Sequence, residues 1–410
     1  MIKFFSSTIS IGLERTPTGI KSAWITTNGT PPPLNRLFTF KPDSDHVKQL
    51  YIHHPLITTG LGAKEILIRP LRLPLVKDKD IDEALIFQAE PLLPYPTDQA
   101  FLAYQVISKT ADSTDLTLLA TQKEAVQTHL EPWKALKIEP EKINSVPSAL
   151  CEFASTYLSA EKTFLILHVH HQEMTCSLIK EGKLWASFTH PEGFNLLLEA
   201  QAKENQTTLP QSESDWQIID LQKNTLLSEA FKRLQKEVTK MGLALAKECK
   251  SGSIEGIAVT GEAVEWGGLS QILIRHLNLP LLTCPPLGEH SSRDLHYYAI
   301  PIGLALGSLP GRPQGVDFRQ QELAYPHPWR RLKMPLMTYF SAIFLLTLAF
   351  YFFGQLYLRD QENQIKQTYI DLLASIKKSH EDFETSFVAK NPRAHDAFNG
   401  EIPTIEQLKQ

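Results

Sequence analysis

Short apolar runs alternate with amphipathic segments over roughly the first 310 residues of the chain. Residues 8–13 and 20–25 are predicted to be strands on either side of a Thr-Pro-Thr-Gly turn. Further strands are predicted at 104–108, 115–120, 138–144, 164–169, 175–180, 184–189 and 257–260. Helices are predicted at 80–90, 123–136, from about 148, and at 225–250, 269–277 and 294–306. This alternation is typical of an α/β fold.

The segment 225–250 has one apolar face at helical spacing. Its apolar positions are separated by four and three residues in turn: Leu227, Phe231, Leu234, Val238, Met241 and Leu245. Such a stripe favours a helix packed against the core of its own domain over a coiled-coil surface for a partner. The polar segments 27–33 and 201–215 are predicted to be loops.

Residues 334–358 contain no formally charged side chain. Twenty residues at 1.5 Å per residue span about 30 Å, the thickness of the hydrocarbon core of a bilayer. Trp329, Arg330, Arg331 and Lys333 crowd the N-terminal flank, as at a cytoplasmic membrane interface. We therefore predict a transmembrane helix at 334–358, with the first 333 residues in the cytoplasm and the last 52 or so across the membrane.

Beyond the apolar segment, a heptad pattern continues. Its apolar positions are Leu358, Ile365, Tyr369, Leu372, Ile376 and Phe383. The pattern fits either a dimeric coiled-coil stalk at 359–390 or a single amphipathic helix packed on a partner. Residues 391–410 show no periodicity and are predicted to be an unstructured tail. Residues 309–333, which are rich in Pro and Gly and end in basic side chains, are predicted to be a juxtamembrane linker.

Composition excludes several classes of protein. The 410 residues are 42% hydrophobic and 21% charged, with a net charge of −4. A disordered chain is excluded by this hydrophobic content, and no basic bias points to nucleic-acid binding. The four cysteines form no Cys-x-x-Cys pair, so we expect neither a disulfide framework nor a structural zinc site. The first sixteen residues lack the apolar core of a secretory signal.

Several segments, taken in order, resemble a known family. They are 80–107 (DIDEALIFQAEPLLPYPTDQAFLAYQVI), 118–146, 259–269 with Val-Thr-Gly and Trp-Gly-Gly-Leu, 299–307 (AIPIGLALG), and 316–324 followed by Trp-Arg-Arg. In this order they resemble the actin-like pilus-assembly M family and, with the apolar segment, the type II secretion system protein L family. The resemblance covers about residues 3–358.

The resemblance implies a two-lobed actin-like (ribonuclease H-like or hexokinase-type) domain at 1–308, with a nucleotide cleft between its lobes. In such clefts two strand–turn–strand loops hold the phosphates. Each loop supplies an Asp for magnesium or water and a Gly that lets the backbone approach the phosphate.

This sequence departs from the family pattern in both loops. Glu14 stands at the first Asp position and Thr16 at its Gly position, with Thr18 in the same turn. His168 and His170 take the corresponding positions of the second loop. A neutral imidazole is a poor magnesium ligand, and side chains at the Gly positions obstruct the backbone.

A third loop departs as well, because Glu262 and Ala263 follow Gly261 where the family has glycines. Glu262 is expected to place a negative charge where phosphate would approach. We therefore predict a vestigial nucleotide cleft with no catalytic residues, no required cofactor and no ATPase activity. The histidines 168, 170, 171 and 190 supply no third ligand at metal-binding spacing, so we predict no metal site.

The resemblance implies a non-enzymatic inner-membrane scaffold of a type II secretion or type IV pilus-like machine. Its expected partners are the secretion or pilus ATPase, the M-type and F-type platform proteins, and a second copy of the chain as a homodimer. One alternative is an actin-like ATPase whose nucleotide state acts as a switch. Another is a fused pilus-assembly M/N protein. Secretion L proteins usually carry a ferredoxin-like domain across the membrane, for which the last 52 residues are too few.

Overall fold

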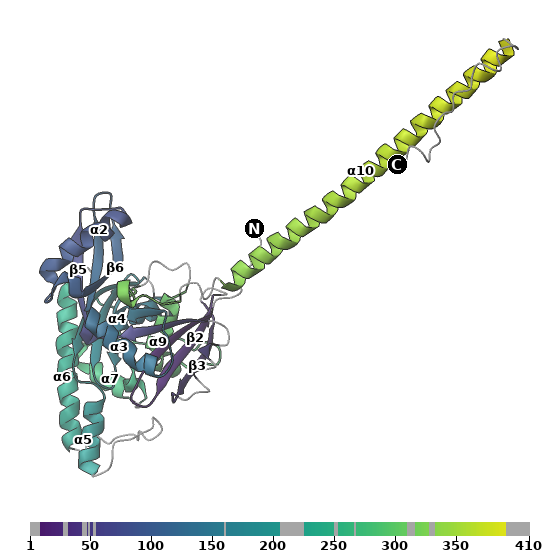
Figure 1. Cartoon of the computed structure of the whole chain (residues 1–410). Helices are drawn as coiled ribbons and strands as arrows, with labels where there is room; N and C mark the ends of the chain where they lie inside the picture. Colours follow the sequence, from purple (N-terminus) through teal and green to yellow (C-terminus); the bar gives the residue numbers. More distant parts are fainter. Residues whose placement is uncertain are drawn as a thin grey trace. The chain divides into compact units, whose positions relative to one another are not determined.

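The computed structural model (Figure 1) describes residues 9–27, 32–42, 47, 50–51, 55–159, 161–205, 225–249, 253–265, 268–309, 316–327 and 333–390. The chain divides into two compact units, Met1–Pro326 and His327–Gln410. The first unit contains three sheets and the helices that cover them. The second contains one long helix.

Two five-stranded sheets of the first unit repeat one topology. The first has the order β3-β2-β1-β4-β8, with β1 (Ile9–Arg15), β2 (Ile20–Thr26), β3 (Leu34–Phe40), β4 (Leu56–Leu61) and β8 (Lys142–Ser145). The second has the order β11-β10-β9-β12-β13, with β9 (Thr163–Val169), β10 (Met174–Lys180), β11 (Lys183–His190), β12 (Ile257–Gly261) and β13 (Leu281–Leu282). In each sheet an antiparallel meander is followed by two parallel strands. This repetition gives the unit its two lobes.

A third, three-stranded sheet has the order β5-β7-β6. Its strands are β5 (Ile66–Leu73), β6 (Ala100–Lys109) and β7 (Thr114–Gln122), and α2 (Asp78–Ala89) covers it. Four strands, β3, β4, β5 and β13, were not predicted from the sequence. Pro70 lies within β5, where the edge position tolerates its missing N–H group.

Two helices pack at the centre between the two five-stranded sheets. They are α4 (Val146–Tyr157) and α9 (Ala299–Gly307), and every residue of α9 is buried. A Cβ on Gly303 would lie 1.8 Å from the backbone oxygen of Ala149, and one on Gly12 would lie 1.9 Å from that of Pro301. These glycines let α9 contact α4 on one side and β1 on the other. Other α-helices described in this unit are α3 (Lys123–Ala135), α5 (Asn195–Asn205), α6 (Thr225–Glu248), α7 (Leu269–Ile274) and α8 (Ser292–Tyr297).

The predicted stripe of α6 is confirmed. Leu227, Leu234, Val238 and Leu245 are fully buried, and α6 lies beside α5 (Figure 1). The predicted helix at 294–306 is wrong, because the chain forms two helices, α8 and α9, that meet at Tyr298. In one continuous helix the ring of Pro301 would clash with the carbonyl group of Tyr297, where α8 ends. The predicted loop at 201–215 is wrong for its first five residues, because α5 continues to Asn205, and residues 206–215 lie outside the described residues.

The predicted linker at 309–333 is shorter than expected. Val316 and Phe318 are buried in the first unit, and the N–H group of Phe318 donates a 2.8 Å hydrogen bond to the carbonyl oxygen of Ile143 in β8. The Arg319 guanidinium donates to the carbonyl oxygen of Pro140 and, at 2.7 Å, to Glu139. Apolar burial and backbone pairing therefore extend the globular unit to this segment.

The second unit contains α10 (Lys333–Lys390), one uninterrupted helix of 58 residues. Among the described residues it is the one helix long and apolar enough to cross a membrane. The candidate span lies within Leu336–Phe383, with a mean hydropathy of 1.9 in its most apolar window, none of which is buried. That exposure distinguishes it from the core helix of a soluble protein.

The described heptad positions of α10, Ile365 and Phe383 among them, are exposed in the single chain. A coiled-coil partner therefore stays a prediction, as do the domain boundaries at 334–358 and 359–390. Trp329, Arg330, Arg331 and the predicted tail 391–410 lie outside the described residues, and Lys333 is the first residue of α10.

Candidate functional site

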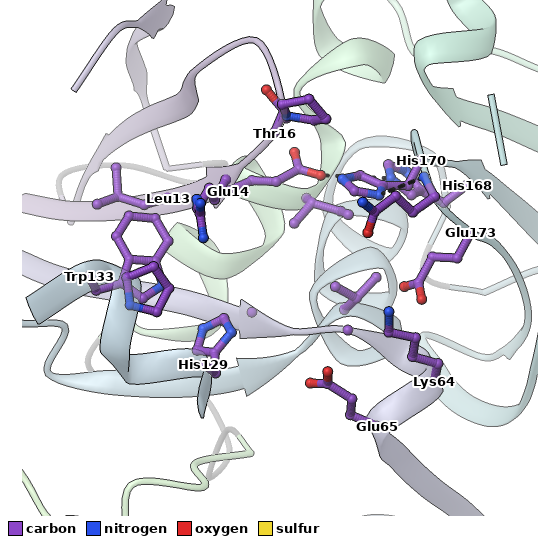
Figure 2. Close-up of a pocket in the computed structure, with 18 of the residues that line it drawn as sticks. Leu13, Glu14, Thr16, Lys64, Glu65, His129, Trp133, His168, His170 and Glu173 are labelled. Atoms are coloured by element: carbon purple, nitrogen blue, oxygen red, sulfur yellow. Dashed lines mark hydrogen bonds and ion pairs between the residues drawn. The ribbon is translucent and has the colours of Figure 1, made fainter. Parts of the chain in front are cut away.

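A cavity of about 500 Å³ opens where the β1–β2 turn and the β9–β10 turn approach each other (Figure 2). The predicted residues Glu14, Thr16, His168 and His170 line it, so the structure brings both departing loops to one site. Its volume is within the range of small-molecule sites. Other side chains that sequence reasoning missed also line it: Arg15, Lys64, Glu65, His129, Trp133, Gln172 and Glu173.

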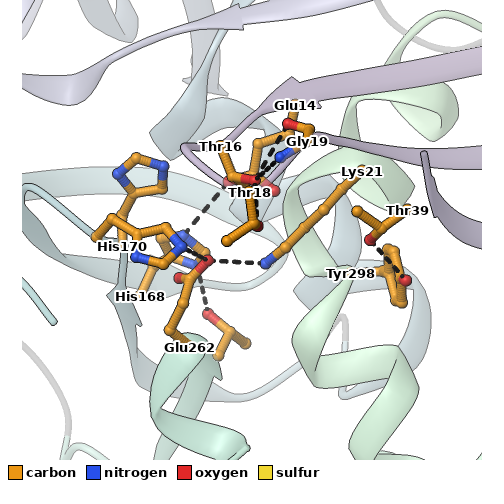
Figure 3. Close-up of polar contacts among 12 residues, drawn as sticks. Glu14, Thr16, Thr18, Gly19, Lys21, Thr39, His168, His170, Glu262 and Tyr298 are labelled. Atoms are coloured by element: carbon orange, nitrogen blue, oxygen red, sulfur yellow. Dashed lines mark hydrogen bonds and ion pairs between the residues drawn. The ribbon is translucent and has the colours of Figure 1, made fainter. Parts of the chain in front are cut away.

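The first turn is closed by Thr16 (Figure 3). The N–H group of Thr16 donates to the carbonyl oxygen of Gly19 at 2.8 Å, and its hydroxyl donates to the same oxygen at 3.1 Å. The Thr16 and Thr18 hydroxyl oxygens lie 3.1 Å apart. The hydroxyl of Thr16 therefore ties the turn together, and its side chain occupies the position that the family pattern leaves to glycine.

The second turn holds two histidines at the cavity. The N–H group of His170 donates a 2.9 Å hydrogen bond to the carbonyl oxygen of Glu173, which closes the turn. The rings of His168 and His170 are stacked with centroids 6.4 Å apart. Burial lowers the pKa of His168 to about 3 and that of His170 to about 4. Both imidazoles are therefore neutral at physiological pH.

His168 is positioned between the two lobes. Its Nδ1 lies 3.0 Å from the hydroxyl oxygen of Thr260 on β12, and its Nε2 lies 3.9 Å from Oε1 of Glu14 on β1. Glu14 stands at the first position predicted for a magnesium ligand and His168 at the second, so a carboxylate faces an imidazole there. Because a neutral imidazole replaces an oxygen ligand there, this pair is poorly suited to magnesium.

Glu262 does not lie where the sequence predicted. It is fully buried, does not line the cavity, and accepts a 2.9 Å hydrogen bond from the fully buried ammonium group of Lys21 (Figure 3). Burial favours the protonated form of Glu262, but Lys21 and the neighbouring histidines together outweigh this cost and hold the pKa of Glu262 below its ordinary value. The expected negative charge against phosphate is therefore neutralised within the protein.

Gly261 has a positive φ of 81° and also lies behind the cavity wall. A Cβ there would lie 2.4 Å from the carbonyl oxygen of Val169 and 2.8 Å from the ring of His168. Glycine at this position lets β12 end against β9 and begins the turn that carries Glu262 toward Lys21.

Sequence reasoning missed Lys21 and Glu173. For Lys21 a signal was available: it lies inside the apolar strand pattern of β2, and a lysine buried there requires a buried partner. Glu173 has no comparable signal, since glutamate is common in turns. His129 on α3 was missed for a similar reason. Burial and, less strongly, the charge of Arg15 lower its pKa to about 4.

The fourth histidine of the predicted set lies elsewhere. His190 contacts Glu192 at 3.3 Å and Glu237 at 3.8 Å. Over the described part of the chain, no three His, Cys, Asp or Glu side chains are grouped so that they could hold a metal ion.

Comparison with known proteins adds the fold relationship. No family model and no curated protein matches the sequence. Among solved structures, the chain is similar to the PilM–PilN type IV pilus biogenesis complex, with 18% identity and a TM-score of 0.55 over 72% of this chain and 97% of that one.

Two further solved structures are similar at lower scores. One is the cytoplasmic domain of EpsL, an inner-membrane component of the type II secretion system of Vibrio cholerae, with 10% identity and a TM-score of 0.38 over 78% of this chain and 100% of that one. The other is MreB5 of Spiroplasma citri bound to AMPPNP, with 9% identity and a TM-score of 0.39 over 74% of this chain and 97% of that one.

The duplicated sheet topology, the central helices α4 and α9, and the cavity between two hairpin turns agree with the similarity to the pilus complex. The predicted fold class is confirmed, and the resemblance inferred from the sequence holds at the level of fold. The first unit of this chain therefore has an actin-like fold, the fold of the pilus-assembly protein that it resembles.

Proposed function

We propose that this protein is a non-enzymatic scaffold of the inner membrane, part of a type II secretion or type IV pilus-like machine. The actin-like unit would lie in the cytoplasm and dock the secretion or pilus ATPase. The apolar part of α10 would cross the membrane once. M-type and F-type platform proteins and a second copy of the chain are the proposed partners within the membrane.

Three observations support the proposal. The fold is shared with a protein of a pilus biogenesis complex. The helix α10 is long and apolar enough to span a bilayer. The cavity at the hairpin turns carries side chains that suit magnesium and phosphate poorly.

The last observation carries the argument against an enzyme. At the meeting point of the two turns, a neutral His168 faces the Glu14 carboxylate at 3.9 Å. Thr16 and His170 place side chains where the family pattern has glycine. At the two positions where the family pattern has Asp, a phosphate would meet the Glu14 carboxylate, and magnesium would find one carboxylate in place of two.

Calorimetry with Mg-ATP on the full chain in detergent tests the proposal, together with an assay of ATP hydrolysis. We expect neither binding at micromolar concentration nor hydrolysis above background. Binding of Mg-ATP at micromolar concentration, or hydrolysis above background, would favour the alternative, a nucleotide-switched ATPase. The matched variant is the double substitution His168→Asp with His170→Gly, which restores an oxygen ligand and opens the backbone and should gain nucleotide affinity.

The buried ion pair decides which variant is useful in this test. Glu262→Gly is not suitable, because it would leave the ammonium group of Lys21 buried without its carboxylate partner.

Docking is tested separately by co-purification of the full chain with the ATPase and with the M-type and F-type proteins encoded nearby. Retention of the ATPase in the absence of nucleotide is expected for a scaffold.

A further inference from the structure

A lysine of the first lobe ends inside the second lobe. Lys21 lies on β2, and its fully buried ammonium group donates a 2.9 Å hydrogen bond to Oε1 of Glu262, which follows β12 (Figure 3). The ammonium group also lies 3.5 Å from the ring centroid of Tyr297, the last residue of α8. A carboxylate and an aromatic face both stabilise a cation that has lost its water. The second lobe thus contains a cation pocket that a side chain of the first lobe fills.

The walls of this pocket are held within the second lobe itself. His296 fixes α8 against β12, because its Nε2 accepts a 3.0 Å hydrogen bond from the N–H group of Cys284 and its Nδ1 donates a 2.7 Å hydrogen bond to the carbonyl oxygen of Val259. Nε2 of His171, in the turn between β9 and β10, lies 3.4 Å from Oε1 of Glu262. The pocket therefore belongs to one lobe as a unit, and Lys21 enters it from the other.

A second contact crosses between the lobes in the opposite direction. Glu173 lies in the turn between β9 and β10 of the second lobe and is 8% exposed. Its Oε1 accepts a 3.2 Å hydrogen bond from the N–H group of Ala63, the first residue of η1 (Ala63–Glu65), which follows β4 of the first lobe. Glu173 lines the cavity, whereas Lys21 does not (Figure 2). Each lobe thus places one charged side chain against the other, at the cavity and behind it.

The burial of the ion pair makes small movements between the lobes unfavourable. A slight shift of one lobe would separate the Lys21 ammonium group from the Glu262 carboxylate while protein still encloses both. An unpaired charge that stays buried is the most costly arrangement for such a pair. The lobes are therefore expected to have one discrete closed position, and to leave it only by a movement large enough to hydrate both charges.

We propose that Lys21 and Glu262 form a latch between the lobes, which keeps the actin-like unit closed through its own side chains, independently of any ligand in the cavity. The hydrogen bond from Ala63 to Glu173 supports the same position at the cavity. The unit accordingly presents one fixed surface to the molecules that bind it. The inference does not rest on the proposed function, because the latch would hold the lobes of an ATPase as well.

Distances between two spin labels, one on each lobe, test the latch in the full chain in detergent. The labels are attached to Asn35→Cys on β3 and Lys232→Cys on α6, both at exposed positions. The chain also carries Cys249→Ser, since the other three cysteines are buried. We expect a single narrow distance distribution that Mg-ATP does not change.

Glu262→Ala should shift this distribution by several ångströms and broaden it, because the closed position would then enclose an unpaired ammonium group. Formate, a small carboxylate that fits the space left by the side chain, should restore the narrow distribution. Thermal melting checks that the variant is folded, and Glu262→Gln, which fills the same space, is measured if Glu262→Ala is not.

Two variants serve as controls. Lys21→Met with Glu262→Met removes both charges and should keep the distribution of the parent. Glu255→Gln breaks an exposed ion pair with Lys162 in the second lobe and should also leave it unchanged. A change of the same size in Glu255→Gln would show that the labels respond to any loss of charge, which overturns the inference.

The remaining outcomes are equally decisive. A folded Glu262→Ala or Glu262→Gln chain with the distribution of the parent overturns the inference, as does a parent whose distances shorten when Mg-ATP is added. Mg-ATP that binds without changing the distances would count against the proposed function and leave the latch intact, so the two failures are distinguishable.

Discussion

Lys21 and Glu262 lie 241 positions apart in the sequence and form a 2.9 Å ion pair that is fully shielded from solvent. Lys21 is on β2 of the first five-stranded sheet, and Glu262 follows β12 of the second. The ammonium group also lies 3.5 Å from the ring centroid of Tyr297, and Nε2 of His171 lies 3.4 Å from the same carboxylate. The pair thus connects the two lobes behind the cavity.

Glu262→Gln is expected to lower the free energy of unfolding by about 3–5 kcal/mol, because it leaves a buried ammonium group without its countercharge. The double variant Lys21→Met with Glu262→Met should lose less than the single variant, since no charge stays buried. Urea unfolding of the full chain in detergent measures both. Glu255→Gln, which breaks an exposed pair with Lys162, should change stability by less than about 1 kcal/mol. Equal stability of the parent and Glu262→Gln would show that the pair is not essential to the fold.

The two faces of α6 provide a matched comparison. Leu234→Asp should cost several kcal/mol, on the order of 3 or more, because Leu234 is fully buried and the new carboxylate has no partner there. Leu243→Asp on the same helix should be nearly neutral, since Leu243 is 57% exposed. Thermal melting compares the two variants. If Leu234→Asp melts like the parent, the packing of α6 described above is wrong.

Acid should destabilise the actin-like unit from about pH 6.5 downward. Burial lowers the pKa of His168 to about 3, and those of His170 and His129 to about 4, from an ordinary value of 6.5. Between these values the unfolded chain binds protons that the folded chain does not, so stability falls as the pH falls. Unfolding midpoints measured from pH 7.5 to 4.5 check the slope, and His168→Gln should make it shallower. A flat profile over this range would contradict the neutral state of these rings.

The direction of membrane insertion is a separate prediction. Basic side chains lie before the apolar part of α10, so the N-terminal unit should be cytoplasmic. An alkaline phosphatase fusion after Gln410 should be active, and one after Gly315 should be inactive. The reverse pattern would place the actin-like unit outside and remove the basis for docking a cytoplasmic ATPase.

Much of the fold could be predicted from periodicity and from the order of family-like segments. Antiparallel hairpins such as β9–β10–β11 were evident because their partners are adjacent in sequence and their turns are short. The strands β3, β4 and β5 were less evident for physical reasons. β3 is a half-exposed edge strand, β4 buries two threonines, and β5 contains Pro70. None of them shows a clean alternation of apolar and polar positions.

The site was predicted only in part. The turns at Thr16 and His170 could be placed at a cleft because the resemblance assigns them to one. The partner of Glu262 could not be predicted, since an ion pair across 241 positions depends on how the two lobes pack. Glu173 was missed because its role depends on burial, which the local sequence around a turn does not determine.

Phe318 attaches the segment that precedes α10 to the globular unit, and this attachment determines where a pull on α10 is transmitted to the fold. Going inward from α10, the first printed contacts with the globular unit are those of Gln321 and Glu322 with Lys123, followed by Arg319, which is bound to Glu139 and Pro140. The next contacts inward are the bond from Phe318 to Ile143 and the bond from the N–H group of Ile143 to Asp317. These contacts lie on β8, which pairs with β4, and β4 pairs with β1. Part of any pull on this segment is therefore carried by the sheet that contains Glu14, a residue of the cavity lining.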